Sequence, residues 1–172
     1  MKVIQLHQEE KKIIALAVDN NRQAQQQIYV KFSSKMLGVC RQYIKDIHHA
    51  EDVMIKGFMK VFNNLKNFEH KGSFEGWIRR IMIYECIDFL RVKKNNFNHQ
   101  DIDDITISEK ESVYEMENFS VDDIQNMIDN LPDGYKMVFN LYAIEGYKHQ
   151  EIAEMLKISE GTSKSQLSHA RK

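Results

Sequence analysis

Apolar residues recur every three or four positions along most of this chain, and very little interrupts them. Among 172 residues there are only one proline and seven glycines, the two residue types that most disfavour a helix interior. Because this spacing places side chains on one face of an α-helix, the pattern predicts an all-α fold. With 42% hydrophobic and 28% charged residues, the composition is typical of a globular protein with buried cores.

The charges divide the chain into blocks that the net charge of −1 conceals. Basic residues outnumber acidic ones over 71–94, whereas 101–123 contains many acidic residues and only Lys110 as a cation. Apolar periodicity is weak in the acidic block, which is typical of a polar linker. We therefore predict a helical module over 1–94, an acidic flexible linker over 95–120 and a second helical module over 121–172.

The first module is expected to contain three helices that close a small bundle. The periodicity predicts helices over 24–47, 52–65 and 74–92, with a break at 48–52 and a glycine-containing loop over 67–73. Each helix carries an apolar stripe wide enough to bury against the other two.

The third of these helices has a second, polar face. Arg80, Tyr84, Asp88 and Arg91 follow one another on adjacent turns. Cations can follow phosphates, and aromatic rings can stack on bases that have left a duplex, so this face suits opened nucleic acid. A purely structural explanation is also open, in which the aromatic residues Trp77 and Tyr84 belong to the core and the cations complement the helix C-terminus.

The second module has the pattern of a helix-turn-helix. Leu131-Pro132-Asp133 ends one helix and starts the next, with Asp133 as a possible cap. A helix over 135–144 is closed by Gly146, and a short helix over 149–156, a turn and a helix over 162–172 follow. Thr162 or Ser159 can cap this last helix.

The last helix has the chemistry of a DNA reader. Leu167 and Ala170 point inward, and the positions expected to be exposed are Ser163, Lys164, Gln166, His169, Arg171 and Lys172. Glutamine can pair with adenine, serine can reach several base edges, and the cations can neutralise phosphates in a major groove.

Several motifs of this chain resemble the extracytoplasmic-function (ECF) subfamily of sigma-70 family RNA polymerase sigma factors. The resemblance to region 4 is carried by Leu131-Pro132, Val138-Phe139-Asn140-Leu141, Glu145-Gly146-Tyr147, Glu151-Ile152-Ala153-Glu154, Ile158-Ser159-Glu160-Gly161-Thr162 and Lys164-Ser165. The resemblance to region 2 is carried by Ala50-Glu51-Asp52-Val53, Phe58, the segment Phe74-Glu75-Gly76-Trp77-Ile78-Arg79-Arg80-Ile81 and Ile87-Asp88-Phe89-Leu90-Arg91.

The resemblance implies three contact surfaces and assigns residues to each. Core RNA polymerase would be bound by Asp52, Val53, Lys56, Phe58, Met59 and Phe62. The minus ten promoter element would be melted and read by Phe68, Lys71, Gly72, Ser73, Phe74, Trp77, Arg79, Arg80, Tyr84, Arg91, Lys93 and Lys94. The minus thirty-five element would be read by Thr162, Ser163, Lys164, Ser165, Gln166, His169, Arg171 and Lys172. An anti-sigma factor is a further implied partner, and the linker would run through polymerase.

Some positions depart from the residues common in this family. Ile55-Lys56 stands where glutamine and an acidic residue are frequent, Ser163 stands where valine is frequent, and Gln166 and His169 stand where arginines are frequent. The departure at Ile55-Lys56 concerns the contact with core polymerase. The departures in the last helix point either to an unusual promoter preference or to weaker upstream contacts.

Other functional classes fit the sequence less well. An enzyme is not expected, because the chain has no phosphate-cradling glycine loop and His149-Gln150-Glu151 lacks the spacing of His-Glu-x-x-His. A stand-alone helix-turn-helix regulator stays open as an alternative, although the aromatic and basic third helix fits strand opening better than a ligand pocket. A structural adaptor would leave the base-reading helix unexplained.

We expect no metal and no cofactor. His48 and His49 are predicted to face solvent, and Cys40 and Cys86 to be reduced and buried, because neither pair has the spacing of a metal site. No apolar run approaches the length of a membrane span, so we expect a cytoplasmic protein without membrane insertion.

Overall fold

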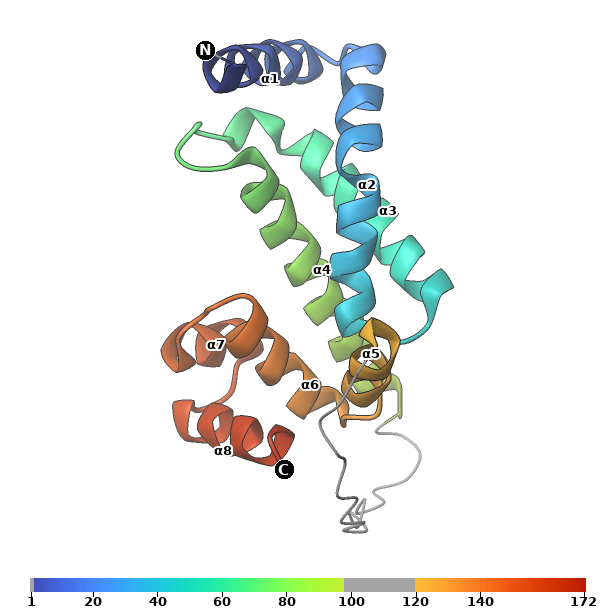
Figure 1. The fold of residues 1–172 in the computed structure, drawn as a ribbon, viewed down its shortest axis with the longest axis vertical. Helices are drawn as coiled ribbons and strands as arrows, with labels where there is room; N and C mark the ends of the chain where they lie inside the picture. The colour runs from blue at the N-terminus through green and yellow to red at the C-terminus, as the bar shows by residue number, and fades with distance from the viewer. Residues whose placement is uncertain (1, 98–119) are drawn as a thin grey trace. The chain divides into compact units, whose positions relative to one another are not determined.

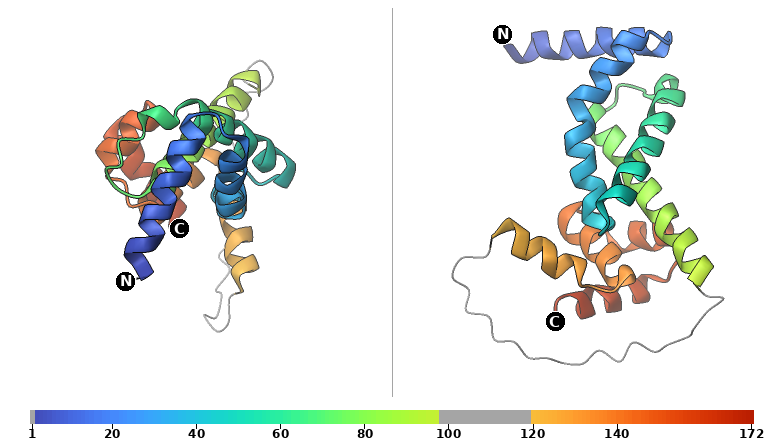
Figure 2. Two further views of the ribbon diagram at one scale, coloured as in Figure 1. Left: turned by 90° about the horizontal axis from the view of Figure 1, so that it is seen from above. Right: turned by 90° about the vertical axis from the view of Figure 1, so that its right-hand side faces the viewer.

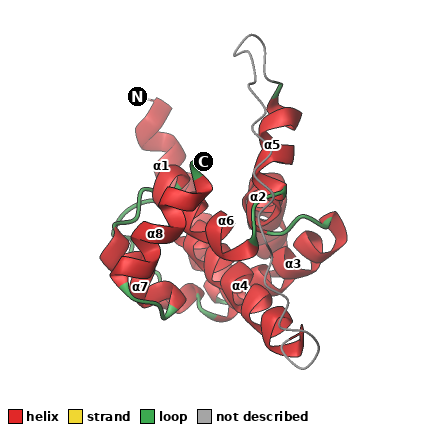
Figure 3. Cartoon of the chain, turned by 90° about the horizontal axis from the view of Figure 1, so that it is seen from below, coloured by secondary structure: helices red, strands yellow, loops and turns green. Residues whose placement is uncertain are grey.

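A computed structural model describes residues 2–97 and 120–172, and within these ranges every regular element is helical (Figure 3). The all-α prediction is therefore confirmed. The described residues fall into two compact units, one ending at Ile87 and the other beginning at Asp88. Most of the predicted acidic linker lies outside the described ranges.

The first unit is built on four helices, of which the fourth continues into the second unit (Figure 1). Their bounds are α1 Lys2–Val18, α2 Arg22–Tyr43, α3 Ile47–Asn63 and α4 Phe74–Phe97, with a 3-10 turn at Leu65–Asn67. The boundary between the two units falls inside α4.

Two side-chain caps determine where the helices of this unit begin. The Asn21 side chain accepts a hydrogen bond from the Ala24 amide at 3.0 Å and starts α2. The Asp46 carboxylate accepts one from the His49 amide at 2.9 Å and starts α3. Such caps satisfy amides that have no partner within the helix. The predicted helix over 24–47 is therefore too long: α2 ends at Tyr43, and Ile47 opens the next helix.

The apolar stripe of α2 forms the centre of the first unit, as its periodicity predicts. Ile28, Phe32 and Met36 are all buried. Cys40 and Cys86 are also buried, as predicted. The pKa of the Cys86 thiol is raised, first because it hydrogen-bonds the Cys40 side chain and then because it is buried.

Helix α1 was not anticipated from the sequence. It crosses α2 near the start of α2 (Figure 2). Its own residues Ile14 and Ala17 are buried, and its Glu10 pairs with Lys31 of α2 at 2.6 Å.

Close packing between α3 and α4 depends on Gly57. A Cβ atom at this position would collide with the Met82 sulfur and lie 3.0 Å from the Met82 methyl carbon. Since Met82 is fully buried, we expect Gly57→Val to lower the free energy of unfolding by about 1–3 kcal/mol through overpacking. Chemical denaturation of the purified protein measures this change.

Gly38 provides the matched control, because a Cβ atom there would meet nothing within 4 Å. Gly38→Ala should raise the stability by about 0.5–1 kcal/mol, since it removes a flexible glycine from the interior of α2. Equal stabilities for Gly57→Val and the parent protein would contradict the proposed tight contact.

Besides the end of α4, the second unit contains four short helices among its described residues. They are α5 Val121–Asp129, α6 Asp133–Phe139, α7 His149–Leu156 and α8 Glu160–Ala170, with a π-helical turn at Asn140–Ile144 between α6 and α7. Gly146 has a φ of 77°, so the predicted left-handed glycine after this segment is confirmed.

Two local predictions in this unit are wrong. The helix expected over 135–144 changes to wider π-type turns after Phe139. Asp133 does not cap α6, because Pro132 occupies the cap position and makes no side-chain bond there. The cap of α8 is Ser159, whose hydroxyl accepts a hydrogen bond from the Thr162 amide at 2.9 Å.

Candidate nucleic-acid interface

An aromatic cluster holds both ends of the loop between α3 and α4. The ring of Phe68 lies 5.0 Å from Phe74 and 5.5 Å from Trp77, and Phe74 and Trp77 stack at 5.8 Å. Phe68 and Phe74 are buried, and Trp77 is half-buried. The two phenylalanines therefore anchor the loop, and the expectation that Phe68 and Phe74 contact the minus ten strand directly is wrong. Of the three rings, Trp77 is the one best placed to meet a ligand.

The loop itself is exposed and turns sharply. Its residues 69–73 are all exposed, and His70 and Gly72 have positive φ angles. The Ser73 hydroxyl accepts a hydrogen bond from the Gly76 amide at 3.3 Å, which fixes the start of α4. Lys71 pairs at 2.7 Å with Glu69, and both side chains are exposed, so solvent weakens this pair and Lys71 can exchange it for a phosphate.

A shallow hollow of about 300 Å³ lies between the end of α3 and α4. Its walls combine amides, aromatic rings and an ion pair between Lys60 and Glu85. The lining residues are Lys60, Asn64, Asn67, Trp77, Ile81, Tyr84 and Glu85. The two asparagines and Lys60 were not predicted as site residues. Lys60 and Asn64 lie at the polar end of the predicted second helix, and Asn67 begins the loop that follows it.

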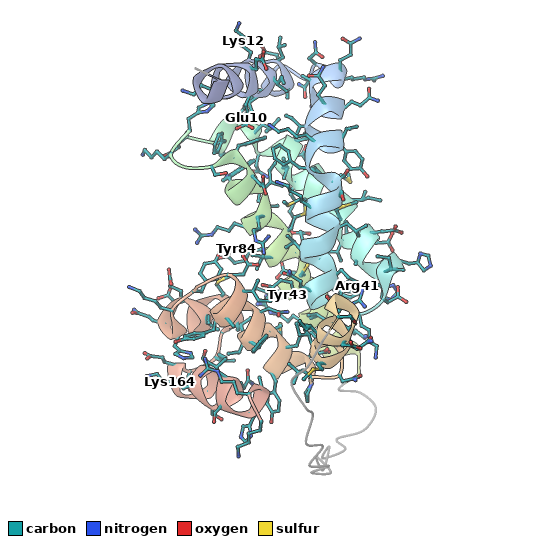
Figure 4. The ribbon with its side chains drawn as sticks, in the orientation of Figure 1. Glu10, Lys12, Arg41, Tyr43, Tyr84 and Lys164 are labelled. Carbon is teal, nitrogen blue, oxygen red and sulfur yellow. The ribbon has the colours of Figure 1, made fainter. Side chains whose placement is uncertain are left out.

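The predicted polar face of α4 is confirmed. The Arg80 guanidinium lies 6.0 Å from the Tyr84 ring centre, and Arg91 pairs with Asp88 at 3.1 Å. Tyr84, labelled in Figure 4, is 38% exposed, so the alternative that places it in the core is wrong. Arg79 is half-buried, Lys93 is exposed, and the side chain of Lys94 lies outside the described residues.

The outer face of α3 differs from the set predicted to bind polymerase. Asp52, Lys56 and Met59 are exposed, and Phe62 is half-buried. Val53 and Phe58 are each 2% exposed; the Phe58 ring packs on Tyr29 of α2 at 4.9 Å. The expectation that Val53 and Phe58 contact a partner directly is therefore wrong, because both lie on the inner face. Ile55, 48% exposed, joins the outer face in their place.

Helix α8 also differs from its predicted surface. Ser163 is fully buried, so the prediction that it is exposed is wrong. Its hydroxyl lies 2.9 Å from Nδ1 of His149 on α7, which draws the side chain inward. Gln166 is half-buried, with its amide beside Gly134 of α6.

The C-terminal half of α8 is tied to the preceding elements by ring contacts. His169 stacks on Tyr135 at 5.4 Å, and the Arg171 guanidinium lies 5.7 Å from the Tyr142 ring centre. Both side chains are exposed despite these contacts. His169 and Arg171 can therefore contact a ligand, while the ring contacts hold their side chains in place.

The N-terminal half of α8 presents the more open polar surface. Of the predicted set, Thr162, Lys164 and Ser165 are exposed on this half of the helix, and Lys172 is exposed beyond its far end, next to Arg171. Lys164, labelled in Figure 4, pairs with Glu160 at 2.7 Å. This hydrogen bond and the charge of Lys164 lower the pKa of the Glu160 carboxyl.

Two family models match this chain. The model described as Sigma-70 region 2 matches residues 28–96, and the model described as Sigma-70, region 4 matches residues 122–172. Together they cover both described units apart from α1 and the start of α2. The chain belongs to the ECF subfamily of sigma-70 factors. This family consists of transcription initiation factors, and the chain is an alternative sigma factor.

Similar proteins come from several bacteria. This sigma factor is 27% identical to the ECF RNA polymerase sigma factor SigW of Bacillus subtilis, with 81% of each chain covered. It is 29% identical to the ECF RNA polymerase sigma factor SigE of Mycolicibacterium smegmatis over 72% of its own length, but it spans only 49% of that relative.

Two solved structures share the fold. One is CnrH in complex with the cytosolic domain of CnrY, with a TM-score of 0.50, 18% identity and coverage of 94% and 92% of the two chains. The other is the sigma factor RpoE in complex with the anti-sigma factor NepR from Bartonella quintana, with a TM-score of 0.54, 20% identity and coverage of 85% and 91%. At these identities the likeness concerns the fold alone.

Proposed function

We propose that this sigma factor binds core RNA polymerase and directs it to a specific set of promoters through three surfaces. The exposed side of α3, with Asp52, Ile55, Lys56 and Met59, would dock on polymerase. The exposed loop 69–73 and the polar face of α4 would hold the opened minus ten strand, and α8 would read the minus thirty-five element.

One observation carries this proposal. A cation and an exposed aromatic ring, Arg80 and Tyr84, lie side by side on α4. This combination can bind an unpaired strand, because the cation contacts the phosphate backbone and the ring stacks on bases of any type. The same chain carries a helix-turn-helix suited to duplex DNA.

The two regions would be joined by a tether. We assign region 2 to residues 1–94, an acidic linker to 95–120 and region 4 to 121–172. The ranges matched by the family models, 28–96 and 122–172, support this assignment. Because each module is small, we expect the free protein to bind promoters weakly until polymerase holds both modules at one separation.

Capture of promoter fragments tests this function. The tagged protein, with and without purified core polymerase, is incubated with sheared genomic DNA from its host, and the retained fragments are sequenced. We expect fragments that share two conserved blocks, enriched only when polymerase is present. Equal enrichment without polymerase would instead support a stand-alone regulator.

An anti-sigma factor is the proposed regulator. Support comes from the RpoE structure, which was solved with the anti-sigma factor NepR. Purification of the tagged protein from its host under non-inducing conditions should recover an inhibitor that competes with core polymerase. Recovery of polymerase alone would count against this regulation.

We propose that the protein acts in the cytoplasm, where its polymerase and promoter partners are found. No helix within residues 2–97 and 120–172 is long and apolar enough to cross a membrane. The proposal rests on the partners rather than on this finding.

Lys164 and Gln166 should have different roles in reading the minus thirty-five element. Lys164→Ala is expected to weaken binding similarly on all promoters. It should also lower the slope of log affinity against log salt concentration by about 1, the value for one lost phosphate contact. Gln166→Ala should instead change the preference at one base position, by about 1–3 kcal/mol. Titrations of polymerase carrying each variant against promoters changed at single positions measure both effects. A uniform loss with Gln166→Ala would remove Gln166 from the base-reading residues.

A further inference from the structure

A part-buried polar pair joins the two helices of the helix-turn-helix. The Ser163 side chain of α8 is fully buried, and its hydroxyl lies 2.9 Å from Nδ1 of His149, the first residue of α7. A buried hydroxyl that loses its partner is costly, because it has given up its bonds to water. The contact therefore favours one relative placement of α7 and α8.

The imidazole of His149 is itself held in place. Its ring stacks on Tyr142 with centroids 4.6 Å apart and planes 21° from parallel. The Arg171 guanidinium lies 5.7 Å from the same Tyr142 ring. Contacts thus run from Ser163, on the first turn of α8, through His149 and Tyr142 to Arg171 at the C-terminal end of that helix. We call these four residues the His149 cluster.

His149 holds α8 near its start through Ser163, and Tyr142 holds it at its end through Arg171. Because these two contacts are far apart along the helix, they restrain both its position and its tilt. A hydrogen bond is more directional than an apolar contact. A valine at position 163 could make only an apolar contact there. A change of helix tilt would move all exposed side chains of α8 relative to the base edges.

We propose that the Ser163–His149 hydrogen bond positions α8 and thereby sets the base preference of this protein at the minus thirty-five element. Ser163 and His149 are positioning residues: they act through the side chains on the outer face of α8. This inference rests on the proposed function of α8 as the reading helix.

The test uses the full-length protein with core polymerase and promoters that share one minus ten element and are randomised at the minus thirty-five element. Sequencing of the bound fraction gives the preference at each base position. Ser163→Ala removes the hydroxyl, and His149→Phe keeps a ring on Tyr142 but removes the nitrogen. Ser163→Thr retains the hydroxyl, and Ser168→Ala changes an exposed serine elsewhere on the same helix.

We expect Ser163→Ala and His149→Phe to change the relative preference at one or more positions by about 2- to 10-fold, the range for loss of one hydrogen bond. The double variant should show the same profile as either single variant, because both remove one interaction. Ser163→Thr and Ser168→Ala should keep the parent profile. Thermal melting of each variant establishes that region 4 is folded.

Three results would overturn the inference. The first is an unchanged base preference in both single variants, whether or not total binding falls, because a merely structural role lowers binding without changing the profile. The second is additive effects in the double variant. The third is the absence of any base preference at the minus thirty-five element in the parent protein, which would also overturn the proposed function of α8. This failure is seen in the unsubstituted protein, whereas failure of the inference alone is seen only in the variants.

Discussion

Cutting the chain once between residues 98 and 119 is expected to lower promoter-specific transcription by about 10²- to 10⁴-fold at nanomolar protein. While the two regions are connected, binding of one raises the effective concentration of the other at its promoter element. After cleavage each region must bind separately, and this advantage is lost. A protease site inserted into this segment allows the comparison in one preparation, by run-off transcription before and after cleavage.

The uncut protein with the inserted site is the control for the insertion itself. Protease treatment of the parent protein, which lacks the site, controls for cleavage elsewhere. Full activity after complete cleavage would show that the two regions bind independently. It would contradict the proposed role of the linker.

Replacing Tyr84 by alanine is expected to lower formation of the open promoter complex by about 5- to 150-fold, because stacking of one base on an aromatic ring contributes about 1–3 kcal/mol. Tyr84 is 38% exposed, with Arg80 beside its ring, so its loss leaves the buried core of region 2 in place. Permanganate reactivity of unpaired thymines in the minus ten element measures the opening.

Tyr84→Phe is the matched control, since it keeps the ring and removes only the hydroxyl. It should open promoters nearly as well as the parent protein. Tyr84→Ala should still bind core polymerase with unchanged affinity, because Tyr84 lies on α4 and the proposed docking surface lies on α3. If Tyr84→Ala opened promoters normally, the ring would not contact the strand.

Much of this fold could be predicted because helical periodicity determines which residues face inward. The stripe of α2 and the polar face of α4 both follow from three- and four-residue spacing. The second module was recognisable because Pro132 and Gly146 mark the breaks before α6 and before α7, and because the motifs that follow are closely spaced. These features depend on residues near one another in the sequence.

The errors concern features that depend on tertiary contacts. Ser163 was expected to be exposed together with the other polar residues of the last helix, but its side chain is buried, and a partner on another helix, His149, makes this burial possible. Val53 and Phe58 were assigned to polymerase by resemblance, whereas their burial against the rest of region 2 places them in its core. The exposure of individual residues follows from packing that the spacing alone does not specify.

The helix boundaries failed for a related reason. The apolar stripe of α2 continues in phase to Ile47, so periodicity alone predicts one helix. The Asp46 cap ends this continuity by starting α3, and a single hydrogen bond decides the boundary. Helix α1 was missed because its apolar pattern is short and it is stabilised by packing on α2.

Run-off transcription from promoters of the host, with core RNA polymerase in the presence and absence of this protein, tests the central claim most directly. It is paired with a binding assay on the same promoters without polymerase. The proposed function predicts transcripts from a discrete set of start sites only when protein and polymerase are both present, and weak binding by the protein alone. Tight, specific duplex binding without polymerase, together with no new transcripts in its presence, would contradict the proposed function and identify a stand-alone DNA-binding regulator.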